Sequence, residues 1–468
     1  MWAAINTASP GDTILLADGT YHMGQSGYYV WIDTPNVTLR SASGNREAVI
    51  LDDNWSASEI ISVIASDVTI ADITIKRART HPIHVISSDG GDTLNTRIYN
   101  VHIIDPGQQA IKINPHAARV YFPHHGEVAC SHLELTAAGR AKVLEINSSC
   151  YTGGVDAHAA QGWEIRDNVI QGFWCASGGL AEHGIHLWSD SSDTLVERNR
   201  LIDNARGIGF GLGSSGHDGG IIRNNMVHTV QDVGIGLESS PGTEVYNNTV
   251  YTGEYFNSIE YRFAATSGVK VINNLTNQAI ASRDGGSGTV QTNVTDARAD
   301  WFTDTAAGDL HLASDALAEV IDQGQTLGSV SDDFDGESRL QGSAYDIGAD
   351  EYVVLTSRVA DLRLARCIYT SDTLTATLAW TPLAEAVTTS LYYSGTLITA
   401  RTWPSATVLS DTIPGDTGST LAVVPYTAGD TRYFALRSYL TGGQWSDLSN
   451  VAFCPSRRVL LPIVFKDG

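Results

Sequence analysis

Short apolar strands that end in asparagine recur along much of the chain. They occupy residues 97–100, 164–168, 196–199, 222–225, 245–248 and 271–274. After the first gap, successive strands are separated by roughly 20 to 30 residues, which is the length of one solenoid coil. We expect each asparagine to stack on the next, with its amide bonding within the turn and to the neighbouring coil.

A second family of strands alternates with the first. Its members are residues 82–85, 110–113, 154–157, 184–187, 207–210, 234–237, 258–261 and 279–282. Their apolar residues recur at every second position and always in the same two columns. Such columns face a core, so the positions between them point to solvent. The pattern predicts a parallel β-solenoid.

These coils resemble the right-handed parallel β-helix of the pectate-lyase-like superfamily, roughly over residues 10 to 350. Residues 10–14 with 18–21 resemble its opening coil, and residues 333–336 with 346–351 resemble the closing segment of secreted bacterial members. From about Ser357 the chain changes to spaced strands with aromatic residues, as in a small β-sandwich. We therefore predict an all-β chain: a β-helix with an N-terminal cap over 1–354, an antiparallel sandwich resembling a fibronectin type III domain over 355–456, and a tail over 457–468.

Charge and apolar content limit the partners. The formal net charge is −23, which disfavours nucleic acid and provides no basic face for an anionic membrane. No apolar run reaches membrane-spanning length, and we expect a monomer.

The cysteines indicate an oxidising compartment. Cys130 and Cys150 bracket one segment, Cys367 and Cys454 bracket the C-terminal domain, and Cys175 is left over. Two bridges and one buried thiol suit a secreted or cell-surface protein, although five buried thiols are the alternative. No signal peptide is visible, and the opening residues look like the middle of a capping helix, so we expect that the true N-terminus differs.

Outward positions of the second strand family provide a surface map, because adjacent coils lie about 4.8 Å apart. The first column reads His84, Lys112, Asp156, His186, Gly209, Gly236, Glu260, Ala281, and the second reads Ile86, Asn114, His158, Trp188, Gly211, Glu238, Arg262, Arg283. The glycines would leave a shallow floor for an extended polymer, and the Trp188 ring suits the apolar face of a sugar. The alternative is an ordinary solvated face on which the glycines let a loop pack.

Residues 151–158 resemble the Asp-Pro-His motif of the mannuronan C5-epimerases, β-helix enzymes that act on alginate. Asp156 and His158 match that motif, with Ala157 in place of Pro. One coil earlier, Lys112 and Asn114 stand where the family has Lys-x-Asp, and one coil later His183 stands where it has His-Gly-Phe. The sequence departs from the family at Glu182, where the family has Arg, and at Tyr151, which is displaced by two residues from the catalytic Tyr.

Removal of a proton from C5 of a uronic acid needs a neutralised carboxylate, a base, and an acid or leaving group on the other face. We expect Lys112 and Asn114 to hold the carboxylate. His158, oriented by Asp156, is the expected base or acid. The opposite face falls to Tyr151 with His183 or His186. The sequence leaves open whether the product is an epimer or an unsaturated sugar.

The sequence supports three further expectations about the substrate and the reaction. Lys112, Arg262 and Arg283 would supply a local positive field for a polyuronate substrate. A glycoside hydrolase using Glu238 and Glu260 is the runner-up, although Arg262 beside Glu238 favours an ordinary ion pair. A non-catalytic glycan-binding surface protein is the third possibility.

Metal binding is not located by the sequence. Ca²⁺ is the one candidate cofactor, because the superfamily commonly binds it, and no His or Cys group has zinc-like spacing. The scattered histidines are expected to lie outside the site: His84, His102, His116, His124, His125, His217 and His228.

Overall fold

The computed structural model describes residues 1–25, 29–313, 317–352, 358–370, 372–399, 402–427, 430–441 and 446–454. The chain forms two compact units, Met1–Phe334 with Arg339–Tyr352, and Asp335–Ser338 with Val353–Gly468. The predicted boundary at 354 and the predicted tail over 457–468 lie outside the described residues.

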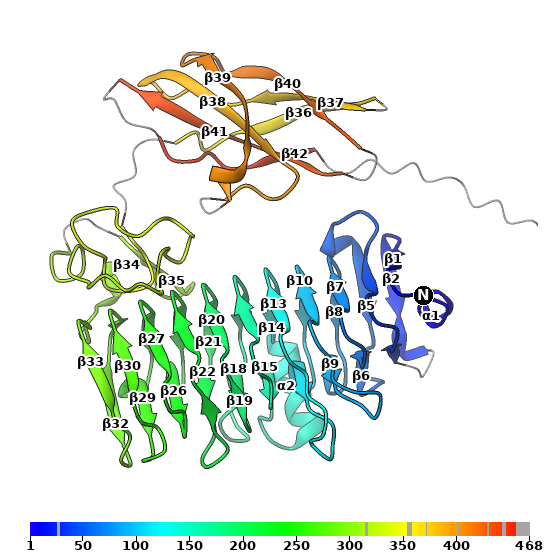
Figure 1. The fold of residues 1–468 in the computed structure, drawn as a ribbon, viewed down its shortest axis with the longest axis vertical. Helices are drawn as coiled ribbons and strands as arrows, with labels where there is room; N and C mark the ends of the chain where they lie inside the picture. Colours follow the sequence, from blue (N-terminus) through cyan, green and yellow to red (C-terminus); the bar gives the residue numbers. More distant parts are fainter. Residues whose placement is uncertain are drawn as a thin grey trace, which may run out of the picture. The chain divides into compact units, whose positions relative to one another are not determined.

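The first unit is a right-handed parallel β-helix built from three sheets (Figure 1). In each sheet the neighbouring strands come from successive coils and run parallel. The first sheet holds β1 (Thr13–Leu16), β4 (Thr38–Ser41), β7 (Thr69–Ala71), β10 (Arg97–Tyr99), β13 (Glu127–Ala129), β16 (Glu164–Arg166), β20 (Leu195–Glu197), β24 (Ile221–Arg223), β27 (Glu244–Tyr246), β30 (Val269–Ile272) and β33 (Gly288–Gln291). The second holds β2 (Gly19–His22), β5 (Val49–Asp52), β8 (Thr74–Lys76), β11 (His102–Ile104), β14 (His132–Glu134), β17 (Val169–Gln171), β21 (Arg200–Asn204), β25 (Met226–Thr229), β28 (Thr249–Thr252) and β31 (Leu275–Thr276). The third holds β3 (Val30–Ile32), β6 (Glu59–Val63), β9 (His81–Ile86), β12 (Gln109–Asn114), β15 (Gly153–His158), β18 (His183–Trp188), β22 (Arg206–Phe210), β26 (Ile235–Glu238), β29 (Asn257–Arg262) and β32 (Ala279–Arg283).

The third sheet has the register that the sequence predicts. Lys112 pairs with His84 and Asp156, Asp156 pairs with His186, and Glu238 pairs with Arg262. The apolar residues that alternate with these positions along each strand form the solenoid core. The predicted inward and outward columns are therefore confirmed.

An asparagine ladder joins the first and second sheets inside the solenoid. It comprises Asn168, Asn199, Asn225, Asn248, Asn274 and Asn293. Each side-chain oxygen accepts from both the backbone and the side-chain N–H of the preceding ladder residue, as between Asn199 and Asn225 at 2.9 and 3.0 Å. The amide of Asn225 in turn donates to the Val196 carbonyl at 2.9 Å. The predicted stacking is confirmed for these coils.

Asn100 does not belong to the ladder. It lies one position before the ladder position of its coil. The residue at this earlier position adopts a left-handed backbone, with φ of 50° at Asn100 and 54° at Asn224. The Asn100 amide donates to Asp72 at 2.8 Å. The recurrence of strand-plus-asparagine is confirmed, but Asn100 directly follows β10, whereas each ladder asparagine comes one residue later, after the left-handed turn residue.

The disulfides are Cys150–Cys175 and Cys367–Cys454, with Cα separations of 5.8 and 6.1 Å. The expected partnership of Cys130 with Cys150 is therefore wrong. Cys130 is a free thiol at the left-handed turn after β13, whereas Cys150 follows the helix α2 (Ala137–Asn147) and meets the next coil. The C-terminal pairing is confirmed.

Helices and a closing segment cover parts of the solenoid. The short α1 (Trp2–Asn6) buries Ile5 at the N-terminal end, as expected for a cap. α2 begins at the N-cap Thr136 and lies between β14 and β15 along the chain. Two short pairs, β19 (Ser191–Ser192) with β23 (His217–Asp218) and β34 (Phe302–Asp304) with β35 (Asp309–Leu312), complete the unit. No helix in the described part of the chain is long and apolar enough to cross a membrane.

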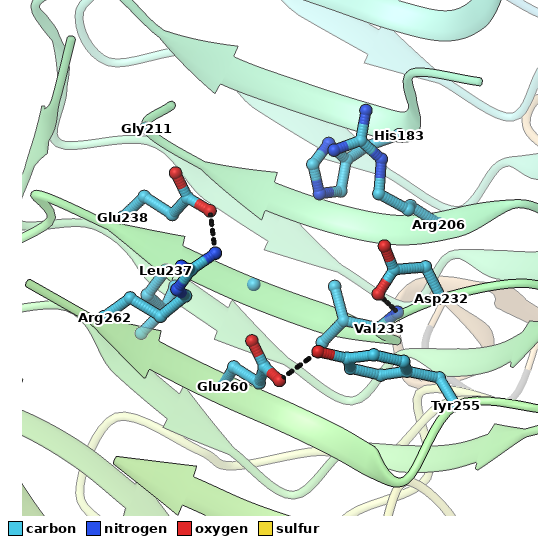
Figure 2. A pocket seen from close by; sticks show the side chains of 11 residues that line it. His183, Arg206, Gly211, Asp232, Val233, Leu237, Glu238, Tyr255, Glu260 and Arg262 are labelled. Atoms are coloured by element: carbon cyan, nitrogen blue, oxygen red, sulfur yellow. Dashed lines mark hydrogen bonds and ion pairs between the residues drawn. The ribbon is translucent and has the colours of Figure 1, made fainter. Parts of the chain in front are cut away.

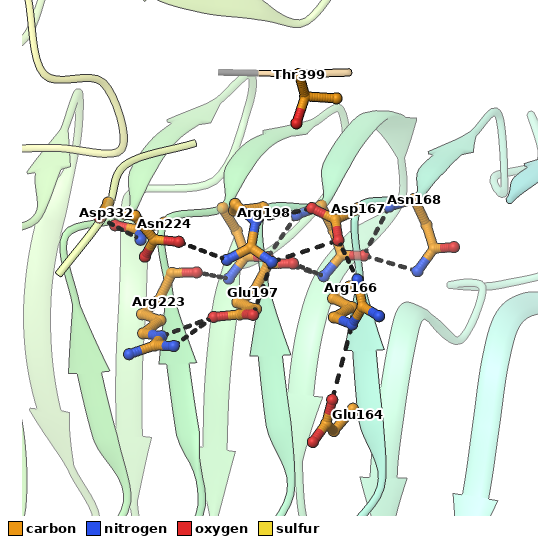
Figure 3. A network of polar contacts seen from close by, with 12 residues as sticks. Glu164, Arg166, Asp167, Asn168, Glu197, Arg198, Arg223, Asn224, Asp332 and Thr399 are labelled. Atoms are coloured by element: carbon orange, nitrogen blue, oxygen red, sulfur yellow. Dashed lines mark hydrogen bonds and ion pairs between the residues drawn. The ribbon is translucent and has the colours of Figure 1, made fainter. Parts of the chain in front are cut away.

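Buried ion pairs attach the segment around Asp332, called the closing segment here, to the first sheet (Figure 3). Arg198 is 3% exposed and bonds Asp167 at 2.8 Å, Glu197 at 2.8 Å and Asp332 at 3.1 Å. Asn224 also donates to the Asp332 carbonyl at 2.8 Å. Because a buried guanidinium needs all of these acceptors, the segment around Asp332 is held at one position on the coils.

The second unit contains two antiparallel sheets that share one core. Their strands are β36 (Arg363–Tyr369), β37 (Thr373–Ala379) and β40 (Ser419–Pro425), and β39 (Thr407–Pro414), β38 (Ala386–Ser394), β41 (Arg432–Leu440) and β42 (Ala452–Cys454). Trp380 and Phe434 lie in this core, and the Cys367–Cys454 bridge joins the two sheets. The predicted sandwich is present, and its likeness to fibronectin type III domains stays a prediction.

We predict that Asn225→Ala destabilises the solenoid by about 1–3 kcal/mol. It leaves the buried backbone N–H of Asn199 without its acceptor and removes a donor from the Val196 carbonyl, whereas the Asn199 amide keeps the Ile165 and Glu197 carbonyls. The shift of the urea midpoint measures the effect. Asn293→Ala at the more exposed end of the ladder is the matched control and should cost under about 1 kcal/mol, because water replaces the lost partners. Equal shifts for the two variants would refute a cooperative buried ladder.

We also predict that acid destabilises the fold through His217. This residue is 2% exposed, bonds Thr194 at 2.7 Å and stacks on Phe210. Burial lowers the pKa of His217 from 6.5 to about 3. The unfolded chain therefore binds the extra proton first, and stability falls as pH drops from about 6.5 toward 3, by up to about 1.4 kcal/mol per pH unit. His217→Gln should flatten the pH dependence of the urea midpoint in this window, whereas His22→Gln at an exposed position should not; an unchanged slope in the first variant would contradict the assignment.

Candidate functional site

Three consecutive strands of the third sheet, β12, β15 and β18, bring the predicted residues together. β12 carries Lys112 and Asn114, and β15 carries Asp156 and His158. β18 carries the remaining three: His183, His186 and Trp188. Adjacent strands are in register, so the side chains of neighbouring coils meet.

Asp156 is the centre of this cluster and is 3% exposed. Its carboxylate pairs with the Lys112 ammonium, accepts from the Trp188 indole at 2.8 Å, and lies 3.5 Å from Nε2 of His158. Burial alone would raise the pKa of Asp156, but its contact with His158 and the charge of Lys112 hold that pKa well below its usual range. Asp156 is therefore a fixed negative charge under the surface.

His158 is the accessible member of the cluster, with a side chain that is 20% exposed. Its Nε2 lies 3.0 Å from Nζ of Lys112, and its Nδ1 lies 3.5 Å from Nδ2 of Asn114. A lysine ammonium can only donate, so Nε2 is the acceptor in this contact. The Trp188 ring packs edge-on against the imidazole, with centroids 4.5 Å apart.

The cluster extends by one coil toward the N-terminus. His84 bonds Asn114 Oδ1 at 2.9 Å through Nε2 and Glu59 at 2.7 Å through Nδ1. From the sequence, His84 was expected to lie outside the site. Its outward column position next to Lys112 was the signal that it belongs to the same network.

His183 and His186 lie one coil later and are almost completely buried, at 5% and 1% exposure. Their ring centroids are 4.6 Å apart. Nε2 of His186 donates to the Gly211 carbonyl at 3.2 Å, and its Nδ1 faces Oε2 of Glu182 at 3.4 Å. Burial holds the pKa of His183 well below its ordinary value.

The glycines have a different use from the open floor that the sequence suggests. A Cβ atom added at Gly209 would lie 2.7 Å from the His183 ring, so this glycine makes room for the imidazole. Gly211 has φ of +77°, and its added Cβ would lie 1.7 Å from the Glu238 carbonyl. Only Gly236 keeps a comparatively open position, and the predicted floor is largely filled by His183.

Tyr151 precedes β15 and is 40% exposed. Burial and the nearby charge of Asp156 raise the pKa of its phenol, so it stays a proton donor at neutral pH. Tyr151 precedes β15 and His158 ends it, so the two residues stand at opposite ends of this strand.

A small polar pocket of about 90 Å³ lies toward the C-terminal coils and is shown in Figure 2. Its lining includes His183, Arg206, Asp232, Glu238, Tyr255, Glu260 and Arg262. Glu260 accepts from Tyr255 at 2.6 Å and from Arg283 at 2.9 Å, and Glu238 pairs with Arg262 at 3.2 Å. The two carboxylates of the expected hydrolase are therefore both ion-paired.

Sequence reasoning missed four residues of this region as functional candidates: Glu182, Arg206, Asp232 and Tyr255. Arg206 pairs with His183 in the β-register and contacts Glu182 at 3.4 Å, so one further outward column would have identified it. Asp232 and Tyr255 come from turns between strands, where no period indicates direction. Burial raises the pKa of Asp232.

Four lysine and arginine side chains on this face each have a carboxylate partner. The pairs are Lys112–Asp156, Arg206–Glu182, Arg262–Glu238 and Arg283–Glu260. The expected free positive field of Lys112, Arg262 and Arg283 is therefore largely neutralised at short range.

Two side-chain clusters in the described part of the solenoid unit are close enough to hold an ion, and neither suits Ca²⁺. The groups of carboxylates and imidazoles close enough to share an ion each contain two histidines: His102, His132 and Glu134, and Glu182, His183 and His186. Ca²⁺ prefers six to eight oxygen ligands, so neither group suits it.

Comparisons with known proteins agree with the architecture. A family model described as a right handed beta helix region matches residues 135–276, and no curated protein matches the sequence. The solved structure of pectate lyase Pel9A is similar with a TM-score of 0.53 and 17% identity, over 75% of this chain and 90% of that chain. The A-module of the Azotobacter vinelandii mannuronan C-5 epimerase AlgE6 gives a TM-score of 0.34 and 14% identity, over 64% and 94%. The fold inference rests on the family model, the lyase and the observed coils: this chain is a right-handed parallel β-helix protein.

Proposed function

We propose that this chain is a secreted enzyme that acts on a polysaccharide by taking the C5 proton of a uronic acid, as a lyase or a C5-epimerase. The observation that carries the proposal is the exposed imidazole of His158 set against the buried Lys112–Asp156 ion pair. The two disulfides support an oxidising compartment. The names of the similar structures, a pectate lyase and a mannuronan epimerase, support the substrate class.

His158 is the proposed base. It is the accessible nitrogen base of the cluster, and Lys112, Asn114 and Trp188 hold its ring in one orientation. The fixed ring lowers the cost of orienting the base, and Nε2 takes the proton after the Lys112 ammonium releases it. Lys112 and Asp156 are positioning residues, because they are buried and bonded to each other.

Tyr151 is the proposed acid, since it is 40% exposed, and burial and the charge of Asp156 raise the pKa of its phenol, which keeps it protonated at neutral pH. His158 takes the C5 proton, and the electron pair of the broken C5–H bond is held by the C6 carboxyl group as its enolate. If the C4–O4 bond then breaks, that pair forms the C4=C5 double bond and O4 takes the proton of Tyr151. If C5 instead takes that proton on the opposite face, the product is the epimer.

We predict that His158→Ala lowers turnover by about 100-fold or more, since a positioned general base contributes about 10²–10⁴. Binding of the same polysaccharide should change by only a few-fold. Turnover is measured on a panel of uronic-acid and neutral polysaccharides. Product is followed by the ultraviolet absorbance of unsaturated uronate, by reducing ends and by proton NMR. His228→Ala, on the second sheet, is the matched control and should keep full activity. Unchanged turnover in His158→Ala would remove His158 from the mechanism.

Trp188 distinguishes an enzyme from a simple glycan binder. We predict that Trp188→Ala weakens polysaccharide binding about three- to tenfold through loss of a stacking surface. Trp188→Phe keeps a ring but loses the N–H bond to Asp156, so it should retain most of the binding and lose turnover. A protein that binds through Trp188 but forms no product on any glycan of the panel would be a binder.

A glycoside hydrolase is the second candidate, because one pocket holds an acid with a raised pKa, Asp232, beside the carboxylates of Glu238 and Glu260. In glycosidases, a carboxyl group with a raised pKa acts as the acid and an ionised carboxylate acts as the nucleophile or base. New reducing ends without unsaturated product, lost in both Asp232→Asn and Glu260→Gln but kept in His158→Ala, would favour this activity over the lyase or epimerase.

A further inference from the structure

We propose that Glu182, His183 and His186 form a binding site for one divalent transition-metal ion such as Zn²⁺ or Co²⁺. Each residue offers one ligand atom, and these three atoms lie within 4.8 Å of one another. The site goes beyond the proposed function, because it requires no polysaccharide and no particular reaction.

Two buried imidazole nitrogens provide the main evidence. Nδ1 of His183 is inaccessible to water and makes no hydrogen bond within the described part of the chain, and Nδ1 of His186 is equally buried and faces only Glu182 Oε2, at 3.4 Å. Buried polar atoms in native proteins are almost always satisfied, so an unsatisfied nitrogen beside a histidine–carboxylate contact indicates an absent partner such as an ion. Both side chains are more than nine-tenths buried.

The hydrogen bond of His186 orients it as a ligand. Its Nε2–H donates to the Gly211 carbonyl, which leaves Nδ1, 3.4 Å from Glu182 Oε2, as the nitrogen that can bind an ion. A proton or a metal ion between Nδ1 and the carboxylate satisfies both groups, and the titration below distinguishes the two. An imidazole fixed through its second nitrogen to a carbonyl is the usual arrangement around protein-bound zinc.

Glu182 and His183 complete the set. Two ligand atoms on one ion lie at most about 4.2 Å apart for bonds of about 2.1 Å, so a small rotation of the outermost side chain closes the site. The rings of His183 and His186 are tilted by 43° with their centroids 4.6 Å apart, and one ligand atom of each lies within 4.8 Å of the other. A carboxylate with two imidazoles is a ligand set that suits zinc and its neighbours and leaves a further position open.

The other histidine pair of the solenoid lacks these properties. His102 and His132 are stacked with an interplanar angle of 6°, so their lone pairs run side by side. Both nitrogens of His102 are already bonded, to Glu47 at 3.1 Å and Glu134 at 3.2 Å. This group serves as an internal control for metal binding.

Arg206 opposes the metal, because its guanidinium contacts Glu182 Oε2 at 3.4 Å. This contact makes a specific expectation: removal of the arginine charge should strengthen metal binding at this site, as it removes a cation beside the ion. A side-chain cluster with only a structural role would not respond in this way.

The test uses the untagged full chain after treatment with a chelator, titrated with Zn²⁺ by calorimetry and with Co²⁺ by visible absorption. We expect one ion per chain, an absorption band of a nitrogen- and oxygen-ligated Co²⁺, and affinity reduced at least tenfold in Glu182→Gln and His183→Ala. Glu182→Gln is the milder change and guards against loss of fold, which circular dichroism checks. His102→Ala should bind as the unchanged chain does, and Arg206→Met should bind more tightly.

Three results would overturn the proposal. They are absence of binding to the folded chain, equal affinity in Glu182→Gln and the unchanged chain, and saturation by Ca²⁺ as readily as by Zn²⁺, since imidazole is a poor Ca²⁺ ligand. Because no substrate enters the titration, failure of the polysaccharide panel leaves this result unaffected, and the converse also holds.

Discussion

The in-register stacking of coils is the constraint on which the rest of the structure depends. Each backbone strand pairs with the same strand of the coil before and after it, so a residue's neighbours are set by register and not by folding of a loop. The asparagine ladder fixes this register from inside, because the oxygen of Asn225 accepts two N–H groups of Asn199 and tolerates no slip. A one-residue slip would also turn the core face outward. The site on the third sheet inherits its geometry from that register.

The register explains why a site can be built here from buried charges. Asp156 and Lys112 are adjacent on two coils, so their side chains meet without any loop to order. A buried ion pair is costly unless its remaining hydrogen-bonding positions are filled; the Trp188 indole donates to Asp156, and Nε2 of His158 accepts from Lys112. The side chains that reach the surface, His158 and Tyr151, are then supported from behind. The Cys150–Cys175 bridge lies directly beside Tyr151 in sequence and ties its segment to the following coil.

Most of the fold could be predicted because its period is visible in the sequence. The two outward columns, including Lys112 beside Asp156 and Glu238 beside Arg262, required only alternation and the coil repeat. What failed lies at turns, where the period stops. Asn100 was placed in the ladder although it occupies the preceding left-handed turn, and Cys130 occupies the equivalent turn and so cannot reach Cys150. The direction of side chains was also invisible: a glycine at 209 reads as open space, whereas His183 from the neighbouring coil fills it.

Charge pairing decides how the face can treat a polyanion. Lys112, Arg206, Arg262 and Arg283 each have a carboxylate partner, and the whole chain has a net charge of −23. Long-range attraction of a polyanion is therefore weak, so the polyuronate binding that we propose would rest on stacking on Trp188 and on short-range contacts as the polymer displaces water. A uronate carboxylate must compete with Glu182, Glu238 or Glu260 for a guanidinium that is already paired. Exchange of one carboxylate for another costs little in charge, so the ion-paired surface accepts a uronate only where shape lets the sugar reach an arginine. Selectivity on such a surface follows from geometry more than from net charge.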